Sequence, residues 1–457
     1  MQKTEKKLSM VSGSPAKSLI AFTIPLILGN LFQQFYNLID SVVVGNYVGE
    51  GALAAVGGTC FSITAVFIAV ATGAGVGCSV IISQLLGADR IADMKTAVLT
   101  ALKSVFLLSL ILAVVGAVFS PQILTLLRTP SDIYSDCLSY LRIYFFGLPF
   151  LFMYNVFASV FNALGDSRTP LMLLIFSSVL NVVLDLLFVI KFNMAVPGVA
   201  WATLIAQAIS AVCSFTILIR RLNRKYETDE EYIKFSVPLL KDMVRVAVPS
   251  IVQQSIISVG IMLVQGVVNS FGSSAVAGVA AANKIDQIVI MPMIAAGNAV
   301  STFTAQNIGA GKADRVRAGY KTAVVMITVM AAVVLVVMQL FGEAFISVFL
   351  DESSSSEALR IGLENLKFLS YFYVMLGLKQ TTDGVLRGSG DVGFFMLGNF
   401  CNLTERVLFA HIMCGTMGVG AVWIAVPIGW TINFLIAILR YSTGKWSKLN
   451  IIKNHDI

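Results

Sequence analysis

Charged residues are scarce in this sequence. Asp, Glu, Lys and Arg make up 12% of the 457 residues, whereas 57% are hydrophobic. A soluble domain carries roughly 25% charged residues, so the composition excludes an ordinary soluble domain and predicts a protein that crosses a lipid bilayer many times. The net charge of +7 gathers in particular loops. It therefore predicts membrane topology and does not indicate nucleic-acid binding.

Groups that carry enzyme chemistry are also few. The sequence has two histidines, His411 and His455, and six cysteines with no CxxC spacing. The glycine-rich run at 387–393 lacks the lysine of a phosphate-binding P-loop. Because no histidine cluster, metal motif or nucleophile–base pair is evident, we expect a protein that is not an enzyme, has no cofactor and does not use ATP.

Apolar runs of spanning length recur along the whole chain. A spanning helix needs about 20 such residues. We expect twelve spans, at 17–45, 52–82, 94–120, 137–162, 169–191, 196–220, 241–269, 275–305, 319–341, 363–386, 393–414 and 418–440. The polar, basic start of the chain runs directly into the first span, which indicates no cleavable signal peptide.

Lys and Arg cluster in alternate loops between these spans. With twelve spans, the clusters near the start, at 90–103, 220–225 and 312–321, and near the end all fall on the side that holds both termini. The positive-inside rule makes that side cytoplasmic. We therefore predict a multi-pass protein of the cell (plasma or inner) membrane with cytoplasmic termini, and we expect a monomer.

The two halves of the sequence resemble each other at an offset of 221–225 residues. Pro25 aligns with Pro249, and Gly165 with Gly390. Six spans per half keep the repeats in one orientation, which predicts an all-α fold of two six-helix bundles related by a pseudo-two-fold axis along the membrane normal. We predict an N-terminal lobe at 1–220, a cytoplasmic linker at 221–240 and a C-terminal lobe at 241–457.

Two aspartates, Asp40 and Asp185, lie inside predicted spans. A carboxylate at membrane depth costs several kcal/mol unless it is neutralised, paired or facing water, and such residues usually mark an ion or substrate pathway. The alternative is that they only hold helices together. The repeat aligns Asp40 with an apolar position near Val264, and Asp185 with Arg406. We therefore expect any cation site in the N-terminal half.

Polar residues on the fifth and sixth predicted spans accompany these acids. Asn181 lies four residues before Asp185 and shares its helix face, and Thr203 supplies a hydroxyl on the sixth span. If the helices meet, Asp40, Asn181, Asp185 and Thr203 offer hard oxygen donors that suit H⁺ or Na⁺ and no soft transition metal. Two adjacent carboxylates in a low dielectric favour retaining one proton, which would allow proton exchange near neutral pH. A structural hydrogen-bonded cluster is the alternative.

The first span also carries a polar stripe and a proline. Gln33, Tyr36 and Asn37 follow helical spacing toward Asp40, and we assign them to a substrate cavity together with Asn155. Pro25 lies fifteen residues before Asp40 and permits a kink. This helix would then act as a hinge, and a static kink is the alternative.

Several charged residues in the second half have two possible locations. Arg406 either lines the C-terminal part of a cavity or extends outward to the interface. Lys284 and Asp286 lie either in a cavity wall or at the membrane interface. Glu405 is adjacent to Arg406 in the chain, so the two side chains do not face each other along a helix.

These features together resemble the multidrug and toxic compound extrusion (MATE) family, with the closest resemblance to its DNA-damage-inducible (DinF-like) branch. The motifs are IPLILGN, NLIDSVVVG, SQLLGA with AQNIGA, NALGDSRTP and GVLRGSGD. The resemblance implies a V-shaped fold of two bundles and export of organic cations driven by Na⁺ or H⁺. It assigns ion coupling to Asp40, Asn181, Asp185 and Thr203, the kink to Pro25, and cavity lining to Gln33 and Tyr36. The middle of the seventh span reads VQQSIISVGIMLVQ and contains no acid, which departs from the family branch with a glutamate on that helix.

We therefore predict a cation-coupled secondary antiporter that exports small organic cations or drugs by alternating access. The alternative is a flippase for lipid-linked substrates, from a related superfamily. Such flippases often carry a cationic cavity, whereas the acids of this chain lie in its N-terminal half.

Overall fold

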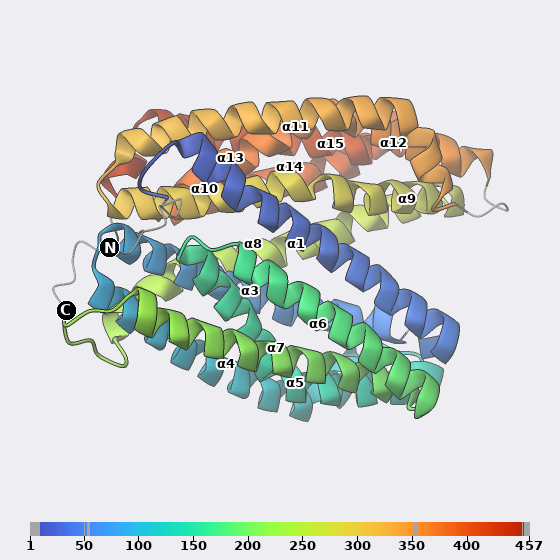
Figure 1. Cartoon of the computed structure of the whole chain (residues 1–457). Helices are drawn as coiled ribbons and strands as arrows, with labels where there is room; N and C mark the ends of the chain where they lie inside the picture. Colours follow the sequence, from blue (N-terminus) through green and yellow to red (C-terminus); the bar gives the residue numbers. More distant parts are fainter. Residues whose placement is uncertain (1–9, 50, 53–54, 351–354, 450, 452–457) are drawn as a thin grey trace. The chain divides into compact units, whose positions relative to one another are not determined.

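The computed structural model of the chain describes residues 10–49, 51–52, 55–350, 355–449 and 451. Every regular element in those ranges is helical (Figure 1). The predicted all-α architecture is confirmed for this part of the chain. His455 and the basic residues closest to each terminus lie outside the described ranges.

Long helices joined by short turns make up both halves of the chain. Those of the first half are α1 (Pro15–Val43), η1 (Val44–Val48), η2 (Ala55–Cys60), α3 (Phe61–Gly87), α4 (Ile91–Leu126), α5 (Ser131–Ala163), α6 (Arg168–Leu186), η3 (Leu187–Lys191) and α7 (Ala195–Lys225). Those of the second half are α8 (Val237–Asn269), α9 (Ser273–Val289), α10 (Met291–Gly309), α11 (Ala313–Ser347), α12 (Ser356–Ser370), α13 (Tyr373–Ser389), α14 (Val392–Met417), α15 (Gly420–Ser442) and η4 (Lys445–Lys448). The segments η1, η2 and η3 are π-helical, and η4 is a 3₁₀-helix.

Nine helical stretches of the described chain are long and apolar enough to cross a membrane. They include all six predicted spans of the first half, and in the second half α9 with α10, α11 and α15. The other predicted spans, at 241–269, 363–386 and 393–414, are also helical. The second of these is interrupted by a turn at 371–372, which leaves α12 and α13 with 15 and 17 residues. Each is shorter than the about 20 residues that a spanning helix typically needs.

Packing divides the chain into two compact units. The N-terminal unit holds Leu28–Ile251, and the C-terminal unit joins the described residues up to Ile27 with those from Val252 onward. Helices α1 and α8 therefore change unit just after their internal prolines, Pro25 and Pro249. Each proline removes a backbone hydrogen bond, so each helix has a weak point next to the place where its packing partners change. The boundaries of these two units fall inside α1 and α8.

The segment before α1 is held firmly within the C-terminal unit. The guanidinium of Arg315 on α11 donates hydrogen bonds to the carbonyl oxygens of Met10, Ser12 and Gly13 at 2.5–3.1 Å. Leu19, one turn into α1, is fully buried in the core of the same unit. The start of α1 is thus anchored by both polar and apolar contacts.

The segment before α8 is held in an equivalent way within the N-terminal unit. The ammonium of Lys95 on α4 lies 5.1 Å from the ring centroid of Tyr232. The backbone N–H of Ser236 donates to the hydroxyl of Thr100 at 3.0 Å, and Leu239 is fully buried. The two halves therefore share this feature as well: in each unit, side chains hold the segment before a helix, α1 or α8, that continues into the other unit.

The repeat also recurs at one tight turn in each unit. Gly165 and Gly390 have φ angles of 78° and 84°, a left-handed conformation that glycine adopts without a steric penalty. The acid after each glycine is held by an arginine near the end of the last long helix of its unit. Arg221 donates to Asp166, and Arg440 donates to Asp391.

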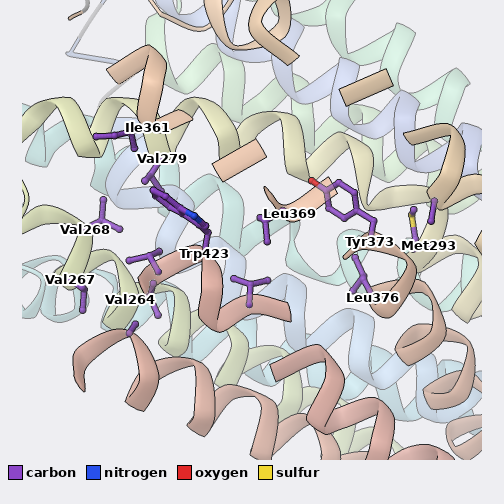
Figure 2. Close-up of a cluster of buried hydrophobic side chains, with 14 of the residues drawn as sticks. Val264, Val267, Val268, Val279, Met293, Ile361, Leu369, Tyr373, Leu376 and Trp423 are labelled. Carbon is purple, nitrogen blue, oxygen red and sulfur yellow. The ribbon is translucent and has the colours of Figure 1, made fainter. Parts of the chain in front are cut away.

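The C-terminal unit has an apolar core built from several helices. Figure 2 shows side chains of this cluster, including Val264 from α8, Leu369 from α12 and Trp423 from α15. Tyr373 is fully buried within it, and Trp423 is 6% exposed. Close side-chain packing of this kind stabilises helix association in a membrane, where lipid is as apolar as the core itself.

Candidate functional site

A cavity of about 600 Å³ lies within the N-terminal unit. It is lined by residues of η2 and of six helices, α1, α3, α5, α6, α7 and η1. The lining includes seven residues selected from the sequence: Gln33, Tyr36, Asn37, Asp40, Asn155, Asn181 and Thr203. The structure thus brings the predicted cavity residues and most of the predicted ion-coupling residues to one place.

The two intramembrane acids meet at this cavity. Asp40 is half-buried and lines it, whereas Asp185 is fully buried behind the lining. Their carboxyl groups lie within hydrogen-bonding range of each other. A hydrogen bond between two carboxyl groups requires that one of them carries a proton. Two carboxyl groups in this arrangement can share a proton.

Residues from three helices surround the acid pair. The amide of Asn181 on α6 donates to the hydroxyl of Thr203 on α7 at 3.4 Å. Tyr36 on α1 is hydrogen-bonded to the same hydroxyl and lies within electrostatic range of Asp40 and Asp185. Carboxyl, amide, hydroxyl and phenol oxygens are hard donors, so this set fits H⁺ or Na⁺ better than a soft metal ion.

Wide helical turns follow both acids. Helix α1 continues after Val43 as the π-helical segment η1, and α6 continues after Leu186 as η3. Val44 of η1 and Val189 of η3 pack into one apolar cluster with Val196 and Val199 of α7. π-Helical turns are rare and frequent at functional sites. Here they begin within one turn of each carboxyl group, and the apolar cluster fixes their place.

The polar stripe on α1 is satisfied by its own neighbours. The amide of Gln33 donates to Asn37 at 3.2 Å, and the amide of Asn37 donates to Gln34 at 3.2 Å. On α5, the amide of Asn155 donates to the carbonyl of Leu151 at 2.9 Å. These side chains present amide oxygens and nitrogens at the cavity surface.

Three tyrosines that were not selected from the sequence also line the cavity: Tyr140, Tyr144 and Tyr154. Tyr140 and Tyr144 stack with their ring centroids 6.4 Å apart. Electron-rich aromatic faces attract cations. On the predicted fourth span, Tyr140 and Tyr144 lie four residues apart and Tyr154 ten residues later, a pattern too weak to select them.

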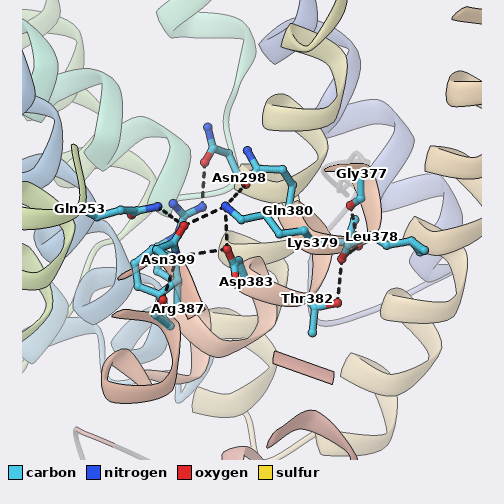
Figure 3. Close-up of polar contacts among 12 residues, drawn as sticks. Gln253, Asn298, Gly377, Leu378, Lys379, Gln380, Thr382, Asp383, Arg387 and Asn399 are labelled. Atoms are coloured by element: carbon cyan, nitrogen blue, oxygen red, sulfur yellow. Dashed lines mark hydrogen bonds and ion pairs between the residues drawn. The ribbon is translucent and has the colours of Figure 1, made fainter. Parts of the chain in front are cut away.

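A buried charged network in the C-terminal unit was also missed (Figure 3). The ammonium of Lys379 on α13 lies 3.0 Å from the carboxylate of Asp383, one helical turn later, and both side chains are over 90% buried. Asn399 on α14 accepts hydrogen bonds at 2.9 Å from Lys379 and from Gln253. The i,i+4 spacing of opposite charges inside a predicted span was the available signal.

The structure defines the locations of the charged residues of the second half that the sequence left open. Asp286 and Arg406 line a second cavity, of about 200 Å³, within the C-terminal unit. Lys284 is exposed and lies 5.5 Å from the ring centroid of Phe349. Glu405 faces Gly429 on α15, and both of its carboxylate oxygens are buried without a hydrogen-bond partner among the described residues.

Comparisons with known proteins agree with this architecture. The MatE family profile matches residues 25–187 and 249–412, once in each half. The chain is 29% identical over 455 residues to the probable multidrug resistance protein YpnP of Bacillus subtilis (strain 168), covering 98% of this chain and 99% of that protein. Solved MATE structures in a bent and in a straight conformation each superpose with a TM-score of 0.87 at 24% identity, covering 98% of this chain and 99% of theirs.

The similarity to solved structures establishes the fold. The MATE neighbours have a twelve-helix fold of two bundles, so the fold class predicted from the sequence is confirmed.

Proposed function

Because this chain belongs to the MatE family of multidrug efflux transporters, we propose that it is a cation-coupled antiporter in which Asp40 and Asp185 carry the coupling ion. The chain is a multi-pass membrane protein of the transporter class. The proposal adds the direction of coupling, the ion site and the substrate class. The ion is H⁺ or Na⁺, and the substrates are small organic cations. The comparisons do not favour the flippase alternative.

One observation carries the proposal: the carboxyl groups of Asp40 and Asp185 lie within hydrogen-bonding range of each other at the cavity. Loss of the shared proton would leave two negative charges side by side in a low dielectric, which is strongly unfavourable. The deprotonated pair therefore favours another arrangement or a replacement cation. An organic cation or Na⁺ that enters the cavity would supply that charge, so ion and substrate would compete for one site.

A change in the bend of α1 is the conformational change that we expect when the charge of the acid pair changes. A bound ion can shift only an equilibrium between states that already exist. Pro25 leaves α1 without one backbone hydrogen bond, beside the point where the helix changes unit. The MATE neighbours solved in bent and straight conformations support such a pair of states for this chain.

The cavity fits the proposed substrate class in size and chemistry. Ligand pockets are typically about 300–1,000 Å³, and this one is about 600 Å³. Its tyrosines present aromatic faces to a cation, and Asp40, the one acid among the described lining residues, supplies the opposite charge. Amide groups at the surface allow varied hydrogen bonds, which suits a promiscuous site.

Transport in proteoliposomes tests the proposal. The purified protein would be assayed for ethidium movement under an imposed pH gradient, and separately under an imposed Na⁺ gradient. We expect one gradient to drive transport by the wild type, and neither to drive it in Asp40→Asn or Asp185→Asn. Glu405→Gln, a matched change of a buried acid in the other unit, should retain transport. Gradient-driven transport by both aspartate variants would contradict the assignment.

A further inference from the structure

The second cavity lies at the place in the C-terminal unit that corresponds to the ion cavity of the N-terminal unit. Positions that line the two cavities are related by the sequence repeat: Thr64 corresponds to Asp286, Ile68 to Ile290, and Tyr144 to Leu369. The fold thus builds the same cavity twice, from equivalent helices, with different side chains.

The charge of the two cavities is reversed at the equivalent acid position. Asp185 of the first cavity corresponds to Arg406 of the second, and Asp40 corresponds to the apolar region around Val264, which lines the second cavity. At the positions of the acid pair, the second cavity therefore has a guanidinium and an apolar wall, and its lining acid, Asp286, lies at the position of Thr64. A site of this kind can no longer hold a cation by the means proposed for the first cavity.

The guanidinium of Arg406 is not neutralised by a direct ion pair. Its Nε is buried without a hydrogen-bond partner, and among the described residues no carboxylate oxygen lies within 4.0 Å of it. Asp286 lines the same cavity, but its carboxylate accepts a hydrogen bond from the hydroxyl of Tyr373. Glu405 faces Gly429 and is not part of the lining. Asp286 and Glu405 lie within electrostatic range of Arg406 but form no ion pair with it. The Nε–H of a buried guanidinium therefore still lacks an acceptor, and a carboxylate ligand could supply one.

The rest of the lining describes what would carry that anion. Trp423, Trp430 and Tyr373 provide aromatic walls, with the rings of Tyr373 and Trp430 centred 6.3 Å apart. Gln265, Asn283 and Gln287 provide amides. The volume of about 200 Å³ is below the usual range for drug-sized ligands, so the cavity suits a single ring with one charged substituent.

We propose that this cavity binds single-ring aromatic carboxylates, with the carboxylate on Arg406 and the ring against Trp423 and Trp430. Arginine holds a carboxylate through two parallel N–H donors. An amino group on the ring would meet the carboxylate of Asp286. This site goes beyond the proposed antiport, since none of its residues belongs to the acid pair and its ligand has the opposite charge.

Equilibrium binding to the purified full-length protein in lipid nanodiscs, without any gradient, tests this proposal. The fluorescent probe 2-aminobenzoate would be compared with 2-aminobenzamide, which has the same shape but no charge. A hydrogen bond to a charged group contributes about 1.5–3 kcal/mol of binding free energy. We therefore predict that the wild type binds the acid at least about tenfold more tightly than the amide. This comparison needs no variant and cannot be confused with a folding defect.

Variants then assign the difference to one residue. Arg406→Gln should bind the acid no better than the amide, and Arg406→Lys should retain part of the preference. Arg360→Gln, a change of an exposed arginine in the same unit, should behave as the wild type. Equal binding of acid and amide by the wild type would overturn the proposal. A full preference for the acid in Arg406→Gln would overturn it as well.

Discussion

At the scale of single residues, the sequence was informative wherever the polarity of a side chain conflicted with its predicted environment. Asp40 and Asp185 could be selected because a bilayer penalises carboxylates, and the structure places them together. Tyr140 could not be selected, because tyrosine is common in membrane helices and gives no conflict. Lys379 and Asp383 were missed because opposite charges one turn apart usually indicate an exposed helix face, whereas here both are buried.

The Lys379–Asp383 pair yields a prediction about stability. Lys379→Met leaves a carboxylate buried without its charge partner, which typically costs about 3–5 kcal/mol. The double variant Lys379→Met/Asp383→Leu removes both charges and should recover most of that loss. Chemical unfolding of the detergent-solubilised variants measures both effects.

A matched control comes from an exposed ion pair of the same unit. Arg317 and Asp314 have side-chain exposures of 55% and 95%, so Arg317→Met should change the free energy of unfolding by less than about 1 kcal/mol. If Lys379→Met were as mild as this control, the buried pair would not contribute in the way we describe.

At the scale of helices, the lengths of spans and the kink prolines could be predicted, whereas local changes of helix type could not. Pro25 and Pro249 are visible in the sequence and lie next to the unit boundaries. The π-helical segments η1 and η3 depend on how Val44 and Val189 pack against α7. Such tertiary contacts leave no periodic signal in the sequence, although these turns position both acids.

Pro25→Ala tests whether the weak point in α1 serves movement. The change restores a donor to the helix interior, where proline costs about 3 kcal/mol relative to alanine, so the thermal midpoint should not fall. Transport should slow while equilibrium binding of ethidium persists. Both would be measured on one preparation. Transport at the wild-type rate would remove the hinge role, and a loss of folding would show that the proline is needed for structure.

The turn between α5 and α6 yields a prediction about pH. Burial alone would raise the pKa of Asp166, but hydrogen bonds from Thr169 and Arg221, together with the arginine charge, outweigh it and hold that pKa below its ordinary value. A lowered pKa contributes stability that is present above the unfolded value of about 3.9 and is lost as pH falls through the folded value.

Asp166→Asn should therefore be less stable than the wild type at neutral pH, and the gap should narrow as pH falls below about 4. Thermal unfolding over a series of pH values measures this gap. Asp314→Asn, in an exposed pair, should show little gap at any pH. A gap for Asp166→Asn that stayed constant into acid would contradict the role of its charge.

At the scale of the whole molecule, the sequence repeat predicted two related bundles. The structure shows which features the two units share and where they differ. Each unit holds the segment before a helix that continues into the other unit, through Arg315 in one case and Lys95 in the other. Each unit also contains a cavity at the equivalent place, acidic in one and carrying Arg406 in the other. The sequence left open whether Arg406 and Asp286 line a cavity, because each charge could also lie at the membrane interface, and the structure places both in the second cavity.

Topology is also a property of the whole chain. The one-sided distribution of Lys and Arg predicts that both termini and the segment between α7 and α8 are cytoplasmic. Thr228→Cys, on a background without native cysteines, should resist an impermeant thiol reagent added to intact cells and react after permeabilisation. Strong labelling in intact cells would reverse the orientation.

The central claim is that the Asp40–Asp185 pair carries the coupling ion, and proton release on substrate binding tests it most directly. Ethidium binding would be measured by calorimetry in two buffers of different ionisation enthalpy, without Na⁺, for the wild type, Asp40→Asn and Asp185→Asn. The account predicts that the wild type releases about one proton per ethidium bound, because only one can be shared between two hydrogen-bonded carboxyl groups, and that each variant releases none. Two results would contradict this account. One is that both variants release as many protons as the wild type. The other is that ethidium binding to the wild type displaces no proton and, in a parallel titration with Na⁺, no Na⁺ either.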